Sequence, residues 1–312
     1  MSSRSLAQPA VAGPAAISWH QVRMLAGYFA FLLLFAALAV YGYDYYWLDA
    51  ASRPYSAKHA LLRPSGLIGL RLGILGLLMF LVIFLYPIRK RWTWLSRQGS
   101  TRNWMDFHIL LGLAAPFVIA FHASFKFQGF AGMAFWIMVA VSLSGVVGRY
   151  LYVQIPRRVT AAELSLDESN EMLARYATEL AGQRTVPQGD MQRLLRMPGK
   201  EQAARMPVVI ALLYMVWLDA LRPFRVARLR RHSLGAAQSF YHLGGLLRTS
   251  NRELERVIAV ARAQAVLAKK LLFLSRAQQV FHLWHIVHKP FSYGFAVLAV
   301  IHIGVVWALG FI

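Results

Sequence analysis

The chain has 312 residues, of which 58% are hydrophobic and only 15% are charged, whereas about 25% of an average soluble domain is charged. This composition predicts an integral membrane protein. The formal net charge of +21 fits cytoplasmic loops and anionic lipid headgroups, so membrane lipid is an expected partner and nucleic acid is not. Because there is no cysteine, disulfides, thiolate-bound iron–sulfur clusters and covalently attached c-type haem are excluded within this chain.

Apolar stretches long enough to cross a bilayer predict an all-α fold, a polytopic bundle of about five transmembrane helices. A polar N-terminal tail, 1–23, is interpreted as preceding a retained helix and not as a cleaved signal peptide. Residues 24–156 hold the first four spans, 157–280 form a helical cytoplasmic insert, and 281–312 complete the bundle. The expected spans are 24–43, 66–88, 107–125, 127–148 and 290–312.

The insert carries ten of the thirteen acidic residues together with arginine-rich runs, so it is expected to face water. Ser165 with Glu168, and Ser250 with Glu253, have the spacing of capping boxes, and both predict a helix start. No proline follows Ser250 until Pro290. A long amphipathic helix is therefore expected to run into the last span, and its apolar stripe either packs within the insert or docks a soluble redox subunit.

The distribution of lysine and arginine predicts the topology. It places the N-terminus and the insert in the cytoplasm and the C-terminus outside, in what we expect to be a bacterial inner membrane. This topology depends on 207–218, which is apolar but only about twelve residues long. We expect it to form a buried or interfacial helix and not a sixth span.

Two pairs of intramembrane histidines share one spacing. His108 and His122, like His288 and His302, are fourteen positions apart. Fourteen residues fall roughly 40° short of four helical turns and span roughly 21 Å, so both histidines of a pair lie on nearly one face. An intramembrane histidine costs free energy unless it is paired or ligated. Facing imidazoles without thiolates, and with only Asp106 nearby as an acid, suit axial ligation of haem iron better than zinc, which normally needs more ligands.

The stretches DFHILLGLAAPFVIAFH and HKPFSYGFAVLAVIH, roughly in the third to fifth spans, resemble those of di-haem b-type membrane cytochromes, the cytochrome b and cytochrome b561-like group. That group holds two haems with histidine pairs at thirteen- or fourteen-residue spacing. The resemblance implies two bis-histidine haems b that relay electrons across the membrane. It also implies exchange with the quinone pool and with a partner subunit carrying flavin, an iron–sulfur cluster or c-type haem. The insert has no counterpart in the group.

The pairing of the histidines follows from the topology. If the third and fifth spans are parallel, His108 pairs with His288 and His122 with His302. If 207–218 crosses the membrane, the two spans are antiparallel, and His108 pairs with His302 and His122 with His288. The four metal ligands are the same in both cases.

Further cofactor-binding candidates surround these histidines. A glycine near one of these histidines either lets a flat macrocycle approach the backbone or serves helix packing. A basic residue at the end of a span either pairs with a haem propionate or only sets the topology. The glycines are Gly112 and Gly294. The basic candidates are Arg102, Arg149 and Lys289 on the cytoplasmic side and Lys126 on the outer side.

Other histidines leave alternatives open. His285 is a weaker candidate than His288 for the same ligand position, because its interval to His302 is seventeen. A third haem would need His282 or His285 as one ligand and a histidine from another part of the chain as the other. Without a third haem, His282 and His285 are interfacial side chains or part of a quinone or proton site. The candidate partners for that haem are His20, His232 and His242. His59 is interpreted as an ordinary loop residue, and Tyr150 and Asp106 join His285 as candidates near a quinone.

Two rival functions remain at this level. A histidine-based metal or proton transporter would need more intramembrane acids than the sequence offers. A haem-free scaffold subunit would use its insert as the active surface, and its histidines would be structural.

Overall fold

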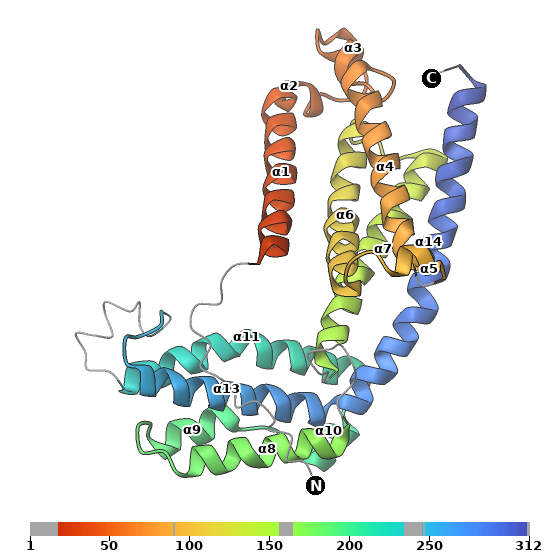
Figure 1. Cartoon of the computed structure of the whole chain (residues 1–312). Helices are drawn as coiled ribbons and strands as arrows, with labels where there is room; N and C mark the ends of the chain where they lie inside the picture. Colours follow the sequence, from red (N-terminus) through yellow and green to blue (C-terminus); the bar gives the residue numbers. More distant parts are fainter. Residues whose placement is uncertain (1–17, 90, 156–164, 234–244, 246, 311–312) are drawn as a thin grey trace. The chain divides into compact units, whose positions relative to one another are not determined.

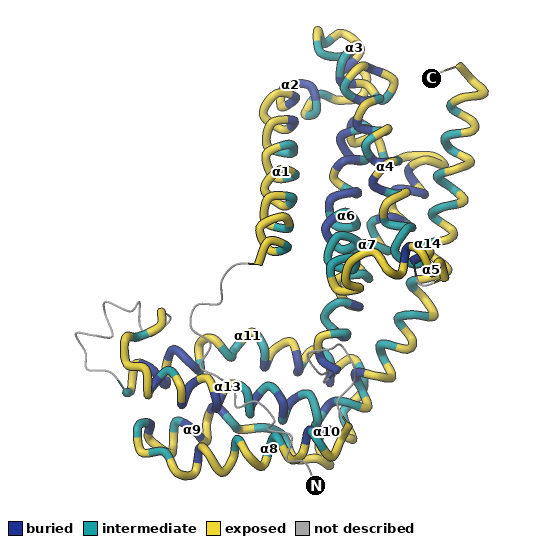
Figure 2. Tube along the Cα trace, in the orientation of Figure 1, coloured by how far each residue is buried: buried dark blue, intermediate teal, exposed yellow. Residues whose placement is uncertain are grey.

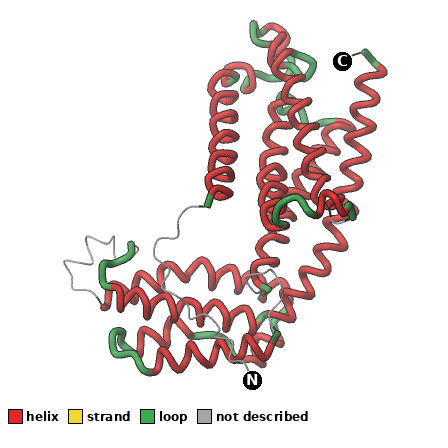
Figure 3. The backbone as a smooth tube through the Cα atoms, in the orientation of Figure 1, coloured by secondary structure: helices red, strands yellow, loops and turns green. Residues whose placement is uncertain are grey.

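The computed structural model describes residues 18–89, 91–155, 165–233, 245 and 247–310, and within them every regular element is a helix (Figures 1 and 3). The described chain divides into two compact units. We call Ala16–Arg149 with Trp284–Ile312 the bundle unit, and Tyr150–Leu283 the insert unit. The helices α7 and α14 each contribute residues to both units.

Five helices of the described chain are long and apolar enough to span a membrane, so the predicted all-α transmembrane architecture is confirmed. They carry large apolar side chains that are exposed, such as Leu32 on α1 and Val300 on α14, as expected of helices in contact with lipid. The five helices are α1 (Trp19–Tyr41), α4 (Leu67–Arg89), α6 (Thr101–His122), α7 (Gly129–Gln154) and α14 (Leu274–Ala308). Shorter helices join them: α2 (Tyr43–Tyr46), η1 (Arg53–Tyr55), α3 (His59–Leu62) and α5 (Thr93–Ser96).

The core of the bundle unit lies on α6, whose closest neighbour is α4 (Figure 2). Small side chains allow this close approach, as is usual between membrane helices. Ala114 and Ala115 are buried in α6, and a Cβ on Gly76 of α4 would lie 2.4 Å from the Cδ1 of Ile119. The α4 and α6 backbones are thereby held in one register.

A buried arginine stabilises each end of this helix pair. Arg53 is 7% exposed and donates to the carbonyl oxygens of Leu48, Tyr46 and Ser124. Arg89 is 6% exposed and donates to the carbonyl oxygens of Ser96 and Gly99 and to the hydroxyl of Thr101, the first residue of α6. A buried charge is tolerated when its hydrogen bonds are satisfied, so both arginines fix loops that join membrane helices.

The insert unit is a packed set of amphipathic helices, in which α13 contacts α8, α9 and α11. Leu254, Ile258 and Ala261 of α13 are buried in its core, so the apolar stripe expected to pack or to dock a partner packs within this unit. The helices are α8 (Leu166–Ala181), α9 (Gln188–Leu195), α10 (Lys200–Arg205), α11 (Val208–Ser233) and α13 (Arg252–Leu272).

The ambiguous apolar segment 207–218 lies mainly in α11, which is not among the five candidate spans of the described chain. Ala211, Met215 and Leu218 are buried there in a cluster with Phe273 and Ala277. The sequence predicted a buried or interfacial helix, and this one buries one face in the insert while Leu213 and Trp217 on it stay exposed.

Several predicted boundaries need correction. Ser165 and Glu168 form the predicted capping box of α8, but α13 is capped by Asn251 and not by Ser250, because the Asn251 side chain accepts from the next backbone amides. The expected continuous helix is broken at Phe273, and α14 begins at the next residue and continues through Pro290.

Candidate functional site

The four histidines lie on two helices of the bundle unit. His108 and His122 are on α6, and His288 and His302 are on α14. His288 is within electrostatic range of His108, and His122 is within range of His302. The first histidine of one helix therefore lies near the first of the other, and the second lies near the second. The two helices run in the same direction (Figure 1), which is the parallel arrangement and not the antiparallel alternative.

His122 is oriented by α4. Its Nδ1 donates to the carbonyl oxygen of Gly69 at 2.8 Å. One turn further along α4, a Cβ on Gly73 would lie 2.8 Å from the Cε1 and 2.9 Å from the Nδ1 of the His122 ring. Contacts this short do not occur between real side chains, so the imidazole occupies the space that a side chain at Gly73 would need.

His108 is oriented by the same helix. Its Nδ1 donates to the carbonyl oxygen of Ile83 at 3.2 Å, and the Tyr86 ring lies 5.3 Å from the imidazole. Ile83 and Gly69 are also fourteen positions apart. Because α4 is antiparallel to α6, two of its carbonyl groups match the two histidines of α6 at the same interval.

His288 is held by α7 and by its own helix. Its Nδ1 lies 2.7 Å from the Ser144 hydroxyl oxygen, which also lies 2.8 Å from the Val141 carbonyl oxygen. The indole of Trp284 stacks on the imidazole with centroids 4.6 Å apart and donates its Nε1 hydrogen to the Ser144 carbonyl at 2.7 Å. A Cβ on Gly148 would lie 2.2 Å from this indole, so glycine is required where the indole packs.

Two of these hydrogen bonds determine a tautomer. A carbonyl oxygen only accepts, so Nδ1 is the protonated nitrogen in His108 and His122. In a neutral ring the metal-binding lone pair is then on Nε2. The Ser144 hydroxyl can donate to or accept from the Nδ1 of His288, so that contact orients the ring without fixing its tautomer. A metal-ligating histidine almost always donates its other ring N–H to a carbonyl or a similar acceptor. For His302, no hydrogen bond to another residue of the described ranges is recorded.

Asp106 holds a polar cluster two residues before His108 along α6. The Nε2 of His20 lies 3.1 Å from one carboxylate oxygen of Asp106, and Arg149 lies 3.3 Å from the other. The His20 ring also packs edge-on against Phe107. Arg149, expected near a propionate, is thus already paired with a carboxylate, and Asp106 joins α1, α6 and α7.

The remaining candidates for cofactor binding are at the surface or beside open space. The side chains of Arg102, Lys126 and Lys289 are exposed. A Cβ on Gly112 or Gly294 would meet no atom within 4 Å, so packing within the described chain does not require glycine at either position.

The other histidines lie outside the two histidine pairs. His282 is exposed, and His285 packs against Trp284. His59 is hydrogen-bonded to the Tyr45 hydroxyl, and His232 pairs with Asp190 in the insert unit. Candidate His242 lies outside the described residues, and Tyr150 donates to Asp219 in the insert unit.

Sequence reasoning missed the residues that orient the histidines, namely Gly69, Gly73, Ile83, Ser144 and Trp284. A carbonyl group has no sequence signature. One usable signal was the glycine series of α4, whose members recur at helical spacing and so mark one face for close approach.

No group of three or more histidine or acidic side chains suited to a metal ion occurs among the residues whose placement is described. The arrangement instead offers two side-chain ligands at each level, which suits a metal that brings further ligands of its own. Comparisons of the chain with family models, with curated proteins and with solved structures found no match.

Proposed function

We propose that this chain is a b-type di-haem membrane cytochrome. The observation that carries the proposal is the matched placement across α6 and α14: His108 lies within electrostatic range of His288, and His122 within range of His302. His108 and His122 donate Nδ1–H to carbonyl oxygens of α4, and the Nδ1 of His288 is hydrogen-bonded to the Ser144 hydroxyl of α7. In His108 and His122 this leaves Nε2 as the metal-binding nitrogen and raises its basicity.

The donor set fits haem. Two neutral imidazoles supply the axial ligands of one iron, and the porphyrin supplies the other four, so no third protein ligand is required. Haem would contribute one-electron redox chemistry at each level of the bundle. The chain would orient the imidazoles through α4 and α7, keep water away with apolar side chains, and tune the two potentials through polarity and hydrogen bonding.

The glycines and basic residues support this assignment. Open space beside Gly112 and Gly294 is suited to the edge of a flat macrocycle. Among the basic candidates, Arg102 and Lys289 at one end and Lys126 at the other are exposed and suited to pair with propionates.

The proposed role is electron relay across the membrane between the quinone pool and a redox partner with its own flavin, iron–sulfur cluster or c-type haem. The absence of cysteine supports such a partner, because this chain cannot hold a thiolate-bound cluster itself. We further propose a bacterial inner-membrane location with the insert in the cytoplasm and the C-terminus outside, supported by the excess of basic residues near the helix ends on the insert side.

Haem quantification tests the proposal. The purified, haem-replete chain should give a b-type reduced-minus-oxidised spectrum and a pyridine haemochrome stoichiometry of two. His288→Ala should lose one haem, whereas His285→Ala should retain both, because His288 is the residue within electrostatic range of His108. A transporter or a scaffold would give no b-type signal, and that result would refute the assignment.

A further inference from the structure

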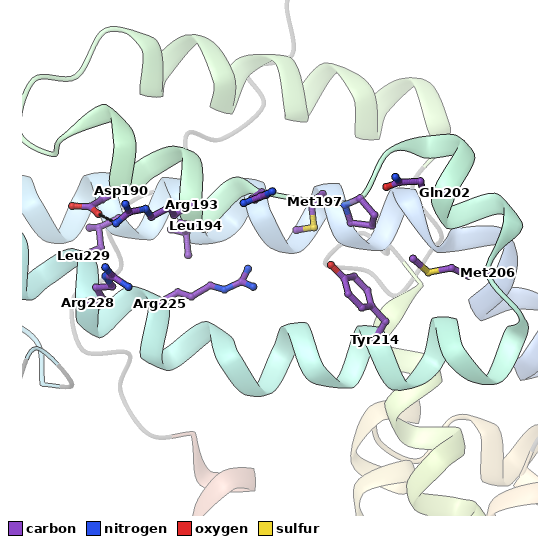
Figure 4. A pocket seen from close by; sticks show the side chains of 12 residues that line it. Asp190, Arg193, Leu194, Met197, Gln202, Met206, Tyr214, Arg225, Arg228 and Leu229 are labelled. Atoms are coloured by element: carbon purple, nitrogen blue, oxygen red, sulfur yellow. Dashed lines mark hydrogen bonds and ion pairs between the residues drawn. The ribbon is translucent and has the colours of Figure 1, made fainter.

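A pocket of about 660 Å³ opens within the insert unit, between α9, the segment after it, and α11 (Figure 4). Its volume is within the usual range of about 300–1,000 Å³ for small-molecule sites. None of the four histidines lines it, so what it binds does not depend on the haem assignment.

One end of the pocket is strongly cationic. Arg193 and Arg196 approach it from α9 and the following residue, and Arg225 and Arg228 approach it from α11. Among the described residues that line the pocket, Asp190 is the one acidic side chain. It is already engaged, because it lies 3.4 Å from Arg193 and 2.8 Å from the Nδ1 of His232.

The arginines of α11 differ in how they are neutralised. Arg222 pairs with Asp219 at 2.6 Å, and Arg230 forms a two-point ion pair with Glu255. Arg225 and Arg228, which line the pocket, have no carboxylate partner within the described ranges. Two arginines of this helix are thus paired with carboxylates, whereas Arg225 and Arg228 leave positive charge at the pocket.

The other end of the pocket is apolar and carries a few polar groups. Met197 and Met206 line it together with the Tyr214 ring, and the Gln202 side chain lies at its edge (Figure 4). Met is adaptable in shape, and an aromatic ring with a hydroxyl group contacts flat or apolar groups well. A ligand that filled both ends would have an anionic group and an organic body.

We propose that this pocket binds a phosphate-bearing organic ligand, with the phosphate among the four arginines and the organic part against Tyr214 and the methionines. A guanidinium presents its N–H groups as a fork that matches phosphate oxygens, which makes arginine the usual residue for such recognition. Two sources offer this chemistry, a soluble nucleotide and the headgroup of an anionic phospholipid.

Isothermal titration of the full-length chain in phosphatidylcholine nanodiscs tests the proposal, with ADP and inorganic pyrophosphate as probes. Both should bind saturably and more weakly as salt is raised. R225Q/R228Q should weaken binding by about tenfold or more, because charged hydrogen bonds are lost. R231Q is the matched control, since Arg231 is exposed on the same helix and does not line the pocket, and it should bind normally.

Phosphatidylglycerol nanodiscs distinguish the sources. If the natural occupant is a headgroup, this lipid should compete with ADP in the wild type; if it is a soluble nucleotide, ADP affinity should be unchanged. R196Q, at an exposed position, provides a second weakened variant if the double variant does not fold by circular dichroism. The proposal is overturned if neither probe binds saturably in phosphatidylcholine, or if R231Q weakens binding as much as the pocket variants do.

Discussion

Replacing Gly73 with alanine should weaken one haem and spare the other. The added Cβ would lie 2.8 Å from the Cε1 of His122 and 2.9 Å from its Nδ1, so the imidazole must move or α4 must separate from α6. Overpacking of this kind costs about 1–3 kcal/mol, which corresponds to roughly a five- to 150-fold loss of affinity for the haem held by His122. The haem held by His108 should remain.

Haem titration of the apoprotein, followed by absorption, measures this effect. Gly304→Ala is the matched control, because an added Cβ on Gly304 would meet nothing within 4 Å and alanine favours a helix over glycine by about 1 kcal/mol. The control should bind two haems with normal affinity. Normal binding of both haems by Gly73→Ala, at unchanged fold, would refute the argument that the His122 imidazole needs this glycine.

Three further predictions concern hydrogen bonds and buried charges. Ser144→Ala should lower the affinity for the haem held by His288 by about 10- to 100-fold, because the His288 ring loses its hydrogen bond. Ser292→Ala is the control, since it removes only a bond to a carbonyl of its own helix, and it should leave haem affinity unchanged. Equal haem affinity of the two variants in titrations would contradict this. Asp219→Ala should lower the free energy of unfolding by about 3–5 kcal/mol, because it leaves Lys269, which is 1% exposed, without its carboxylate partner. Lys269→Met should lower the free energy of unfolding by less, as measured by chemical denaturation. A larger loss for Lys269→Met than for Asp219→Ala would exclude this explanation. Burial acts to raise the pKa of Glu255, but hydrogen bonds from its arginine partner and a backbone amide lower it below the ordinary value of 4.5. Its stabilisation is therefore complete above about pH 4.5 and is lost as pH falls through the lower folded-state pKa, so Glu255→Gln should flatten acid unfolding followed by circular dichroism.

The membrane helices were predictable because a long apolar stretch has few other stable outcomes. The histidine spacing also identified one face on each of α6 and α14, and charge predicted their parallel direction. The orientation of the rings was not predictable. It depends on which carbonyl groups of α4 come level with His108 and His122, and that register is determined by packing between helices far apart in sequence.

Errors at helix ends have a similar cause. Ser250 and Asn251 are adjacent, and both are good caps, so their spacing from Glu253 alone could not decide between them. The helix expected to run into the last span is interrupted at Phe273, but it does continue through Pro290. In a membrane helix, local adjustments can satisfy the backbone groups that proline frees, and a sequence rule for water-soluble helices does not include this effect.

Haem stoichiometry in paired alanine variants tests the central claim most directly. If His122 and His302 hold the same iron, His122→Ala, His302→Ala and the double variant should each retain one haem by pyridine haemochrome assay. His122→Ala combined with His288→Ala should retain none, because each substitution removes a different haem. Retention of one haem in that cross-pair variant, or loss of both in the His122/His302 double variant, would contradict the proposed pairing.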